Sequence, residues 1–170
     1  MKTPIIVPTV FDTSALAKLV LQEPGSDKIH AYIQKHHSAF YVTSWTVGET
    51  LGVIKRSWLK KRICKENYWR ACDELLHTIY DVGWTVEEVH VHEREVFSEC
   101  ERIARKHNLD VIDATQMVVI KKSMLRFFAG ESTPLLVTAD EALWSAARAE
   151  GFRSWNCLKE DEPKRFETEV

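Results

Sequence analysis

The sequence lacks the features of a membrane, secreted or multidomain protein. No apolar run approaches the roughly 20 residues that a membrane-spanning helix needs, and residues 1–4 do not begin the long apolar stretch of a signal peptide. There is no internal repeat, low-complexity tract or linker rich in Pro, Gly and Ser. We therefore expect a cytoplasmic protein with no membrane partner. One domain is predicted over residues 1–158, followed by a polar, frayed tail over residues 159–170.

Cysteine motifs are also missing. The four cysteines, Cys64, Cys72, Cys100 and Cys157, form no Cys-x-x-Cys pair, and no histidines accompany them at zinc-finger spacing. This pattern argues against a structural zinc site and against a disulfide framework. Reduced and mostly buried thiols are expected instead.

Two common catalytic loops and an excess of positive charge are absent as well. Without Gly-x-x-x-x-Gly-Lys-Ser/Thr or Gly-x-Gly-x-x-Gly, the usual nucleotide-cradling loops are excluded, and no Gly-x-Ser-x-Gly elbow supports a serine hydrolase. The chain has 23 Lys and Arg against 25 Asp and Glu, a net charge of -2. Nucleic-acid binders often carry more cations. Carboxylates gathered around a metal would lower the net charge, however, so nucleic-acid binding stays open.

What the sequence does contain is a regular alternation of two patterns. Short apolar, β-branched segments occupy residues 5–11, 40–43, 84–91, 135–138 and 154–157. Helical periodicity occupies residues 15–21, 26–35, 47–60, 65–80, 91–106, 111–128 and 141–150. Strands separated by helices predict an α/β fold with crossover connections and a mainly parallel sheet covered on both faces.

Two local details refine this prediction. Pro8 has no N–H to donate to a ladder, so the first strand should use mainly Thr9–Phe11. The helix predicted over residues 111–128 should bury one apolar face, made of Ile112, Val119, Met124 and Phe127.

Four acids follow the predicted strands or open the predicted helices. Asp12 follows the first strand, and Asp140 follows the fourth. Glu49 lies on the helix after the second strand, and Asp113 lies in the opening turn of a later helix. Ligands of open α/β sheets bind beyond the carboxyl ends of the strands. The four carboxylates could therefore face one edge, where oxygen ligands suit Mg²⁺ or Mn²⁺.

Each acid also has a purely structural alternative. Asp12 and Asp140 could cap the helices that follow them, and Asp110 with Asp113 resembles a capping arrangement. Glu49 could be an ordinary exposed helical acid. Its apolar neighbours, with Gly48 beside it, favour a side chain turned toward a site.

These motifs resemble the four acidic motifs of PIN domains. The matching segments, in the order and rough spacing of that family up to about Leu158, are Phe11-Asp12-Thr13-Ser14, Ser44…Glu49, Leu109…Asp113-Ala114 and Leu-Val-Thr138-Ala-Asp140-Glu. The resemblance implies a three-layer α/β/α sandwich with a sheet of about five strands. It also implies a ribonuclease that hydrolyses RNA with a water activated by Mg²⁺ or Mn²⁺.

The resemblance also assigns roles to individual residues. Asp12 and Asp113 would be the main metal ligands, and Glu49 and Asp140 would complete the catalytic site. The Ser14 and Thr138 hydroxyls would support this site through hydrogen bonds. Asp110 matches no family position and should cap its helix.

The subgroup that the chain resembles is the toxin component of type II, VapBC-like toxin–antitoxin modules. This resemblance implies that the chain forms a homodimer and that a small antitoxin protein is its partner. The competing function is a non-catalytic PIN-like module that binds RNA or protein. A phosphotransfer receiver domain is disfavoured, because Asp12 has no acidic neighbour.

The densest basic stretch covers residues 55–62. Lys55, Arg56 and Trp58 could contact RNA, with phosphates on the cations and a base on the indole ring. Alternatively, the cations mark a helix C-terminus and Trp58 packs in the core or in a dimer contact. His107 could approach the acidic site, and His90 and His92 are expected to be exposed.

Overall fold

A computed structural model of the chain describes residues 6–36 and 39–163. Five short parallel strands form one sheet with the order β3-β2-β1-β4-β5. In chain order, the elements are β1 (Thr9–Phe11), α1 (Thr13–Val20), α2 (Ser26–Lys35), β2 (Phe40–Thr43), α3 (Ser44–Leu59), α4 (Lys65–Tyr80), β3 (Thr85–Glu87), α5 (Arg94–His107), α6 (Val111–Lys122), η1 (Met124–Phe127), η2 (Gly130–Ser132), β4 (Leu135–Thr138), α7 (Glu141–Ala149) and β5 (Arg153–Asn156).

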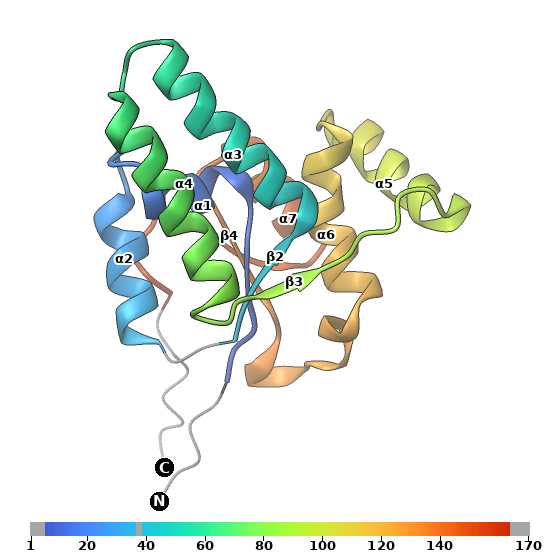
Figure 1. The fold of residues 1–170 in the computed structure, drawn as a ribbon. Coiled ribbons are helices and arrows are strands. Elements are labelled where there is room, and N and C mark those ends of the chain that lie inside the picture. The colour runs from blue at the N-terminus through green and yellow to red at the C-terminus, as the bar shows by residue number, and fades with distance from the viewer. Residues whose placement is uncertain (1–5, 37–38, 164–170) are drawn as a thin grey trace, which may run out of the picture.

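Two hydrophobic cores lie on the two faces of the sheet. Successive strand residues point to opposite faces, so Val10 and Leu136 pack with α5, α6 and α7. Phe11, Leu135 and Val137 pack on the other face with α1 to α4. Figure 1 shows the two helical layers on either side of the central strands. The predicted α/β/α sandwich with a five-stranded parallel sheet is confirmed.

The entry of β1 follows the expectation for proline. Pro8 lies before the strand and only accepts, from the Leu135 N–H at 2.9 Å. The adjacent Thr9 N–H donates to the Ala39 carbonyl at 2.9 Å. The strand therefore uses Thr9–Phe11, as predicted.

The helix predicted over residues 111–128 is too long. α6 ends at Lys122, because Ser123 adopts an extended backbone and its hydroxyl accepts from the Leu125 N–H instead of continuing the helix. Met124 and Phe127 are 67% and 65% exposed, so their prediction as buried residues is wrong. Leu125 takes the buried place on the short η1 helix.

Other boundaries differ at β3 and α5. The apolar run over residues 84–91 forms a strand only at Thr85–Glu87, and α5 begins at Arg94 rather than at residue 91. Within residues 6–36 and 39–163, no helix combines the length and apolar character needed to cross a membrane.

The polar tail predicted from residue 159 begins with contacts to α2. The Lys28 ammonium donates to the Glu160 carbonyl at 2.8 Å, and Lys35 pairs with Glu162 at 3.0 Å. Residues 164–170 lie outside the described residues.

Candidate acidic site

Asp12 lies directly after β1, at the start of α1, and is only 3% exposed. Its carboxylate accepts hydrogen bonds from the Ala15 N–H at 2.8 Å, from the Ser14 hydroxyl at 2.8 and 2.9 Å, and from the Thr138 hydroxyl at 2.6 Å. Asp12 is therefore the N-cap of α1 and also lines the pocket described below. The capping alternative and the site prediction are compatible at this position.

Burial raises the pKa of Asp12 to about 6, even though its three hydrogen-bond donors lower it. The nearby Asp140 carboxylate adds to the rise. An acid that is desolvated and faces a like charge is less stable as an anion. A cation placed beside Asp12 would remove part of this cost.

Ser14 and Thr138 connect the ends of β1 and β4. The Thr138 hydroxyl donates to Asp12 and accepts from the Asp140 N–H at 2.9 Å. The Ser14 hydroxyl accepts from the Ala139 N–H at 2.7 Å. The two hydroxyls thus fix the Asp12 carboxylate and the start of the segment that carries Asp140.

Glu49 lies in the middle of α3, which begins at the end of β2 with Thr43 as its N-cap. Its carboxylate accepts a 2.7 Å hydrogen bond from the Thr13 hydroxyl on α1. This bond joins α3 to the residue that follows Asp12. Thr13 had no predicted role, although it lies inside the Phe11-Asp12-Thr13-Ser14 motif.

Asp113 lies in the first turn of α6 and is half-buried. Its pKa is raised to about 7, first by burial and then by the charges of Asp140, Asp12, Asp110 and Glu49. Asp110 is the N-cap of α6 and accepts from the Ile112 N–H at 2.8 Å, as predicted. The pKa of Asp113 therefore responds to four other acids of this region.

Asp140 is an exposed N-cap of α7, and its carboxylate accepts from the Leu143 N–H at 2.8 Å. It lines a pocket of ≈ 440 Å³ together with Asp12, Glu49 and Asp113. The structure therefore brings the four acids of the sequence prediction around one pocket. They come from four segments that are far apart in the chain, because parallel strands carry the following helices to the same edge.

Lys18 is the only cation among the described residues that line this pocket. It is 6% exposed, and its ammonium pairs with Glu23 at 3.3 Å. Sequence reasoning missed Lys18. The signal that could have found it is its spacing four residues after Ser14 on α1, which places both on one helical face.

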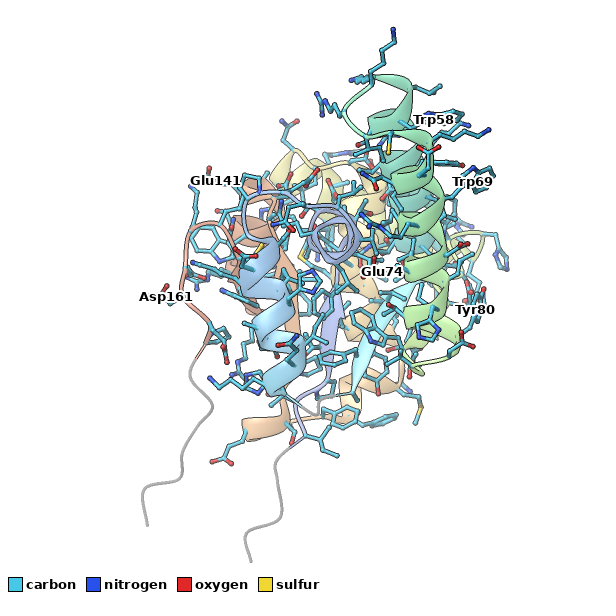
Figure 2. The ribbon with its side chains drawn as sticks, turned by 60° about the vertical axis from the view of Figure 1, so that its left-hand side comes forward. Trp58, Trp69, Glu74, Tyr80, Glu141 and Asp161 are labelled. Carbon is cyan, nitrogen blue, oxygen red and sulfur yellow. The ribbon has the colours of Figure 1, made fainter. Side chains whose placement is uncertain are left out.

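The basic segment over residues 55–62 does not line the acidic pocket. The Trp58 ring stacks on Tyr68 with centroids 4.9 Å apart, and the Lys55 ammonium lies 4.2 Å from the centroid of the Trp58 ring. Figure 2 shows Trp58 near the tip of the α3–α4 hairpin, beside Trp69. Trp58 is half-buried and belongs to neither hydrophobic core. The RNA contact by Lys55, Arg56 and Trp58 and its structural alternative both stay predictions.

His107 also lies elsewhere. Its Nε2 is 2.8 Å from a carboxylate oxygen of Glu150 and it does not line the acidic pocket. His107 pairs with Glu150 instead, so its closeness in sequence to Asp113 does not bring it to the acidic pocket.

The donor set of the pocket fits a hard divalent cation. Five carboxylates line the pocket, and Glu23 is the one that pairs with Lys18. The other four leave only carboxylate oxygens as charged ligand candidates, which suit Mg²⁺ and Mn²⁺. Burial, and after it the charges of neighbouring carboxylates, raise the pKa values of Asp12 and Asp113 and so disfavour their anionic forms. In a metal-bound site, the same charge would favour the cation.

Comparisons with known proteins agree with this fold. The family model of the PIN domain matches residues 9–149, so the chain belongs to the PIN-domain family. The solved structure of PAE2754 from Pyrobaculum aerophilum has a TM-score of 0.57 and 21% identity, covering 87% of this chain and 83% of that chain. This likeness shows the fold. No curated protein matches the chain significantly. PIN domains are generally nucleases, and those nucleases generally use divalent metals.

Proposed function

We propose that this protein is an endoribonuclease that depends on Mg²⁺ or Mn²⁺. The observation that carries the proposal is the convergence of Asp12, Glu49, Asp113 and Asp140 on one pocket. A module that only bound phosphate would have no use for four anions there. Membership of the PIN-domain family supports nuclease chemistry.

Asp12 and Asp113 would hold the metal directly, and Glu49 and Asp140 would complete the site, directly or through water. Bound Mg²⁺ or Mn²⁺ would polarise the scissile phosphate and lower the pKa of the attacking water. Outer hydrogen bonds fix the orientation of metal ligands, and Ser14 and Thr138 provide them to Asp12. The roles of these six side chains are part of the proposal.

Lys18 adds a phosphate-binding function to the proposal. Its ammonium is the lone cation among the described lining residues, and Glu23 holds it at the wall of the pocket. A lysine beside carboxylate-bound metal would attract the negative RNA backbone. This position suits a contact to a phosphate next to the scissile one.

The deciding experiment is cleavage of a labelled, structured RNA pool with Mg²⁺ or Mn²⁺. Wild type should cut, Asp12→Asn should not, and Asp110→Asn should still cut because Asp110 caps α6 outside the pocket lining. Equal cutting by wild type and Asp12→Asn would refute the site. RNA binding without cutting by either protein would favour the non-catalytic module.

We further propose that the protein is the toxin of a toxin–antitoxin pair, acts in the cytoplasm as a homodimer, and is silenced by a small antitoxin. The resemblance of the acidic motifs to those of such toxins and the acidic pocket support this. Induced expression in a bacterial host should arrest growth for wild type and not for Asp12→Asn. Light scattering should give twice the chain mass of 19.7 kDa. A monomer, or equal growth with both proteins, would contradict these proposals.

A further inference from the structure

A second group of metal-ligating side chains lies in the connection between β3 and α5. His90, His92 and Glu93 each offer one donor atom, and the three atoms lie within 4.8 Å of one another. In the part of the chain that the structure describes, no other group of three His, Cys, Asp or Glu donors is this close. None of the three lines the acidic pocket.

The sequence Val-His-Val-His-Glu explains how the two histidines come to the same side. Val89 is 6% exposed, and both Val89 and Val91 pack against the core that contains α5 and α6. The residues that alternate with them, His90 and His92, are exposed. Two apolar anchors therefore present two imidazoles to solvent.

The backbone then folds back and brings Glu93 to the histidines. The Val91 N–H donates to the Val89 carbonyl at 2.8 Å, and the Glu93 N–H donates to the His90 carbonyl at 2.9 Å. The rings of His90 and His92 have centroids 5.7 Å apart. These short-range backbone bonds place the three residues side by side before any ion binds.

The three donors are available for a ligand. Glu93 is the N-cap residue of α5, yet its side chain makes no capping hydrogen bond. All three side chains are exposed. Tetrahedral zinc with bonds near 2.0 Å needs donors about 3.3 Å apart. Small rotations of exposed side chains would close the present separations.

The surrounding charge favours a cation. Glu87, Glu88 and Glu95 lie with His90 and Glu93 around a pocket of ≈ 440 Å³, whose lining also includes Lys122 and Arg126. Five residues of this lining can bind or attract a cation, whereas two carry a positive charge. Such a wall raises the local concentration of divalent ions.

We propose that His90, His92 and Glu93 form a binding site for one borderline transition-metal ion of the Zn²⁺ class. Two imidazoles and one carboxylate suit Zn²⁺, Co²⁺ or Ni²⁺, whereas the all-carboxylate pocket suits Mg²⁺ and Mn²⁺. The bound ion joins the start of α5 to the segment that follows β3, and water completes its coordination. The site is independent of the proposed nuclease centre.

Zn²⁺ titration by calorimetry tests the proposal in the full-length Asp12→Asn/Asp113→Asn protein, whose acidic pocket has lost its two main ligands. We expect one bound Zn²⁺, and Co²⁺ in its place should give a visible absorption band. Loss of even an outer-shell partner weakens metal sites by roughly 10–100-fold. His92→Ala and Glu93→Gln should therefore weaken Zn²⁺ binding by more than roughly tenfold.

His77→Ala in the same background is the matched control. His77 is an exposed histidine that pairs with Asp81 at 2.6 Å, and among the described residues it belongs to no group of three close donors. Its removal should leave the Zn²⁺ affinity unchanged.

Unchanged Zn²⁺ binding in both His92→Ala and Glu93→Gln, or an equal loss in His77→Ala, would overturn the proposal. So would the absence of Zn²⁺ binding to a protein whose circular dichroism spectrum is that of the folded chain.

Discussion

The Thr138 hydroxyl donates a 2.6 Å hydrogen bond to the Asp12 carboxylate, across 126 positions of sequence. Thr138 is the last residue of β4, and Asp12 follows the last residue of β1. The two strands are direct neighbours in the sheet. The bond therefore depends on the parallel pairing of β1 with β4, and it orients an acid that is otherwise destabilised by burial.

Replacing Thr138 tests this positioning role. Thr138→Val removes the donor to Asp12 and the acceptor for the Asp140 N–H while keeping the side-chain shape. Because outer hydrogen bonds orient metal ligands, we expect Mn²⁺ affinity to fall by roughly 10–100-fold. Thr138→Ser retains the hydroxyl and should behave like wild type. Equal Mn²⁺ affinities for Thr138→Val and Thr138→Ser, measured by calorimetry, would show that the hydroxyl has no such role.

The stability of the metal-free protein should depend on the ionisation of Asp12. The folded pKa is about 6 against an ordinary value of 3.8, so the folded state binds more protons between these values. Stability therefore falls as pH rises through this window. A rise of about two pKa units corresponds to roughly 3 kcal/mol, and altered capping would offset part of it. Asp12→Asn should thus stabilise the protein by about 1–2 kcal/mol at pH 7.5 in EDTA.

Urea unfolding of wild type and Asp12→Asn at pH 4.5 and pH 7.5 measures this difference. The higher unfolding free energy of Asp12→Asn should appear at pH 7.5. The difference from wild type should shrink at pH 4.5, where the wild-type Asp12 carboxyl is protonated in the folded state. A destabilised Asp12→Asn at both pH values would mean that capping of α1 dominates at this position.

Metal binding should show the opposite pH dependence. Carboxylates bind metal when deprotonated, and the pKa values of Asp12 and Asp113 are about 6 and about 7. Mn²⁺ affinity should therefore increase as pH rises from 5 to 8, with most of the change between pH 6 and 7. Asp110→Asn should show the same profile, shifted slightly to lower pH because Asp110 contributes to the raised pKa of Asp113. A flat profile would exclude these two acids as ligands.

A separate ionic network should govern stability in acid. Glu150 contacts Arg102, Lys106 and His107, which lower its pKa to about 2. A depressed carboxyl pKa stabilises the fold above pH 4.5 and loses this effect as pH falls toward 2. Because the Arg102 and Lys106 side chains are about half exposed to solvent, we expect Glu150→Gln to cost about 1 kcal/mol at pH 7.

Thermal unfolding as a function of pH checks this prediction. The deficit of Glu150→Gln should vanish near pH 2, and the exposed Glu74→Gln control should show none at either pH. A deficit that persists at pH 2 would assign the effect of Glu150 to packing instead of charge.

Much of the fold followed from local patterns. The strands at Phe40–Thr43 and Leu135–Thr138 and the helices at Ser26–Lys35 and Lys65–Tyr80 have the predicted bounds. Pro8 limited β1 as expected from its missing N–H. α6 was predicted too long, because apolar spacing beyond Lys122 imitates a helix while the Ser123 hydroxyl caps a new turn.

The sequence by itself determined the α/β alternation, the cap positions of Asp12, Asp110 and Asp140, and the acids that could meet at one sheet edge. These properties depend on local hydrogen bonding and on the periodicity of apolar residues, which can be read in a single segment. Only the tertiary structure decided that Thr13 holds Glu49, that Lys18 lines the pocket, and that His107 turns away to Glu150. Those contacts depend on which helices become neighbours when the strands pair, because side chains distant in sequence meet only after the sheet order is set.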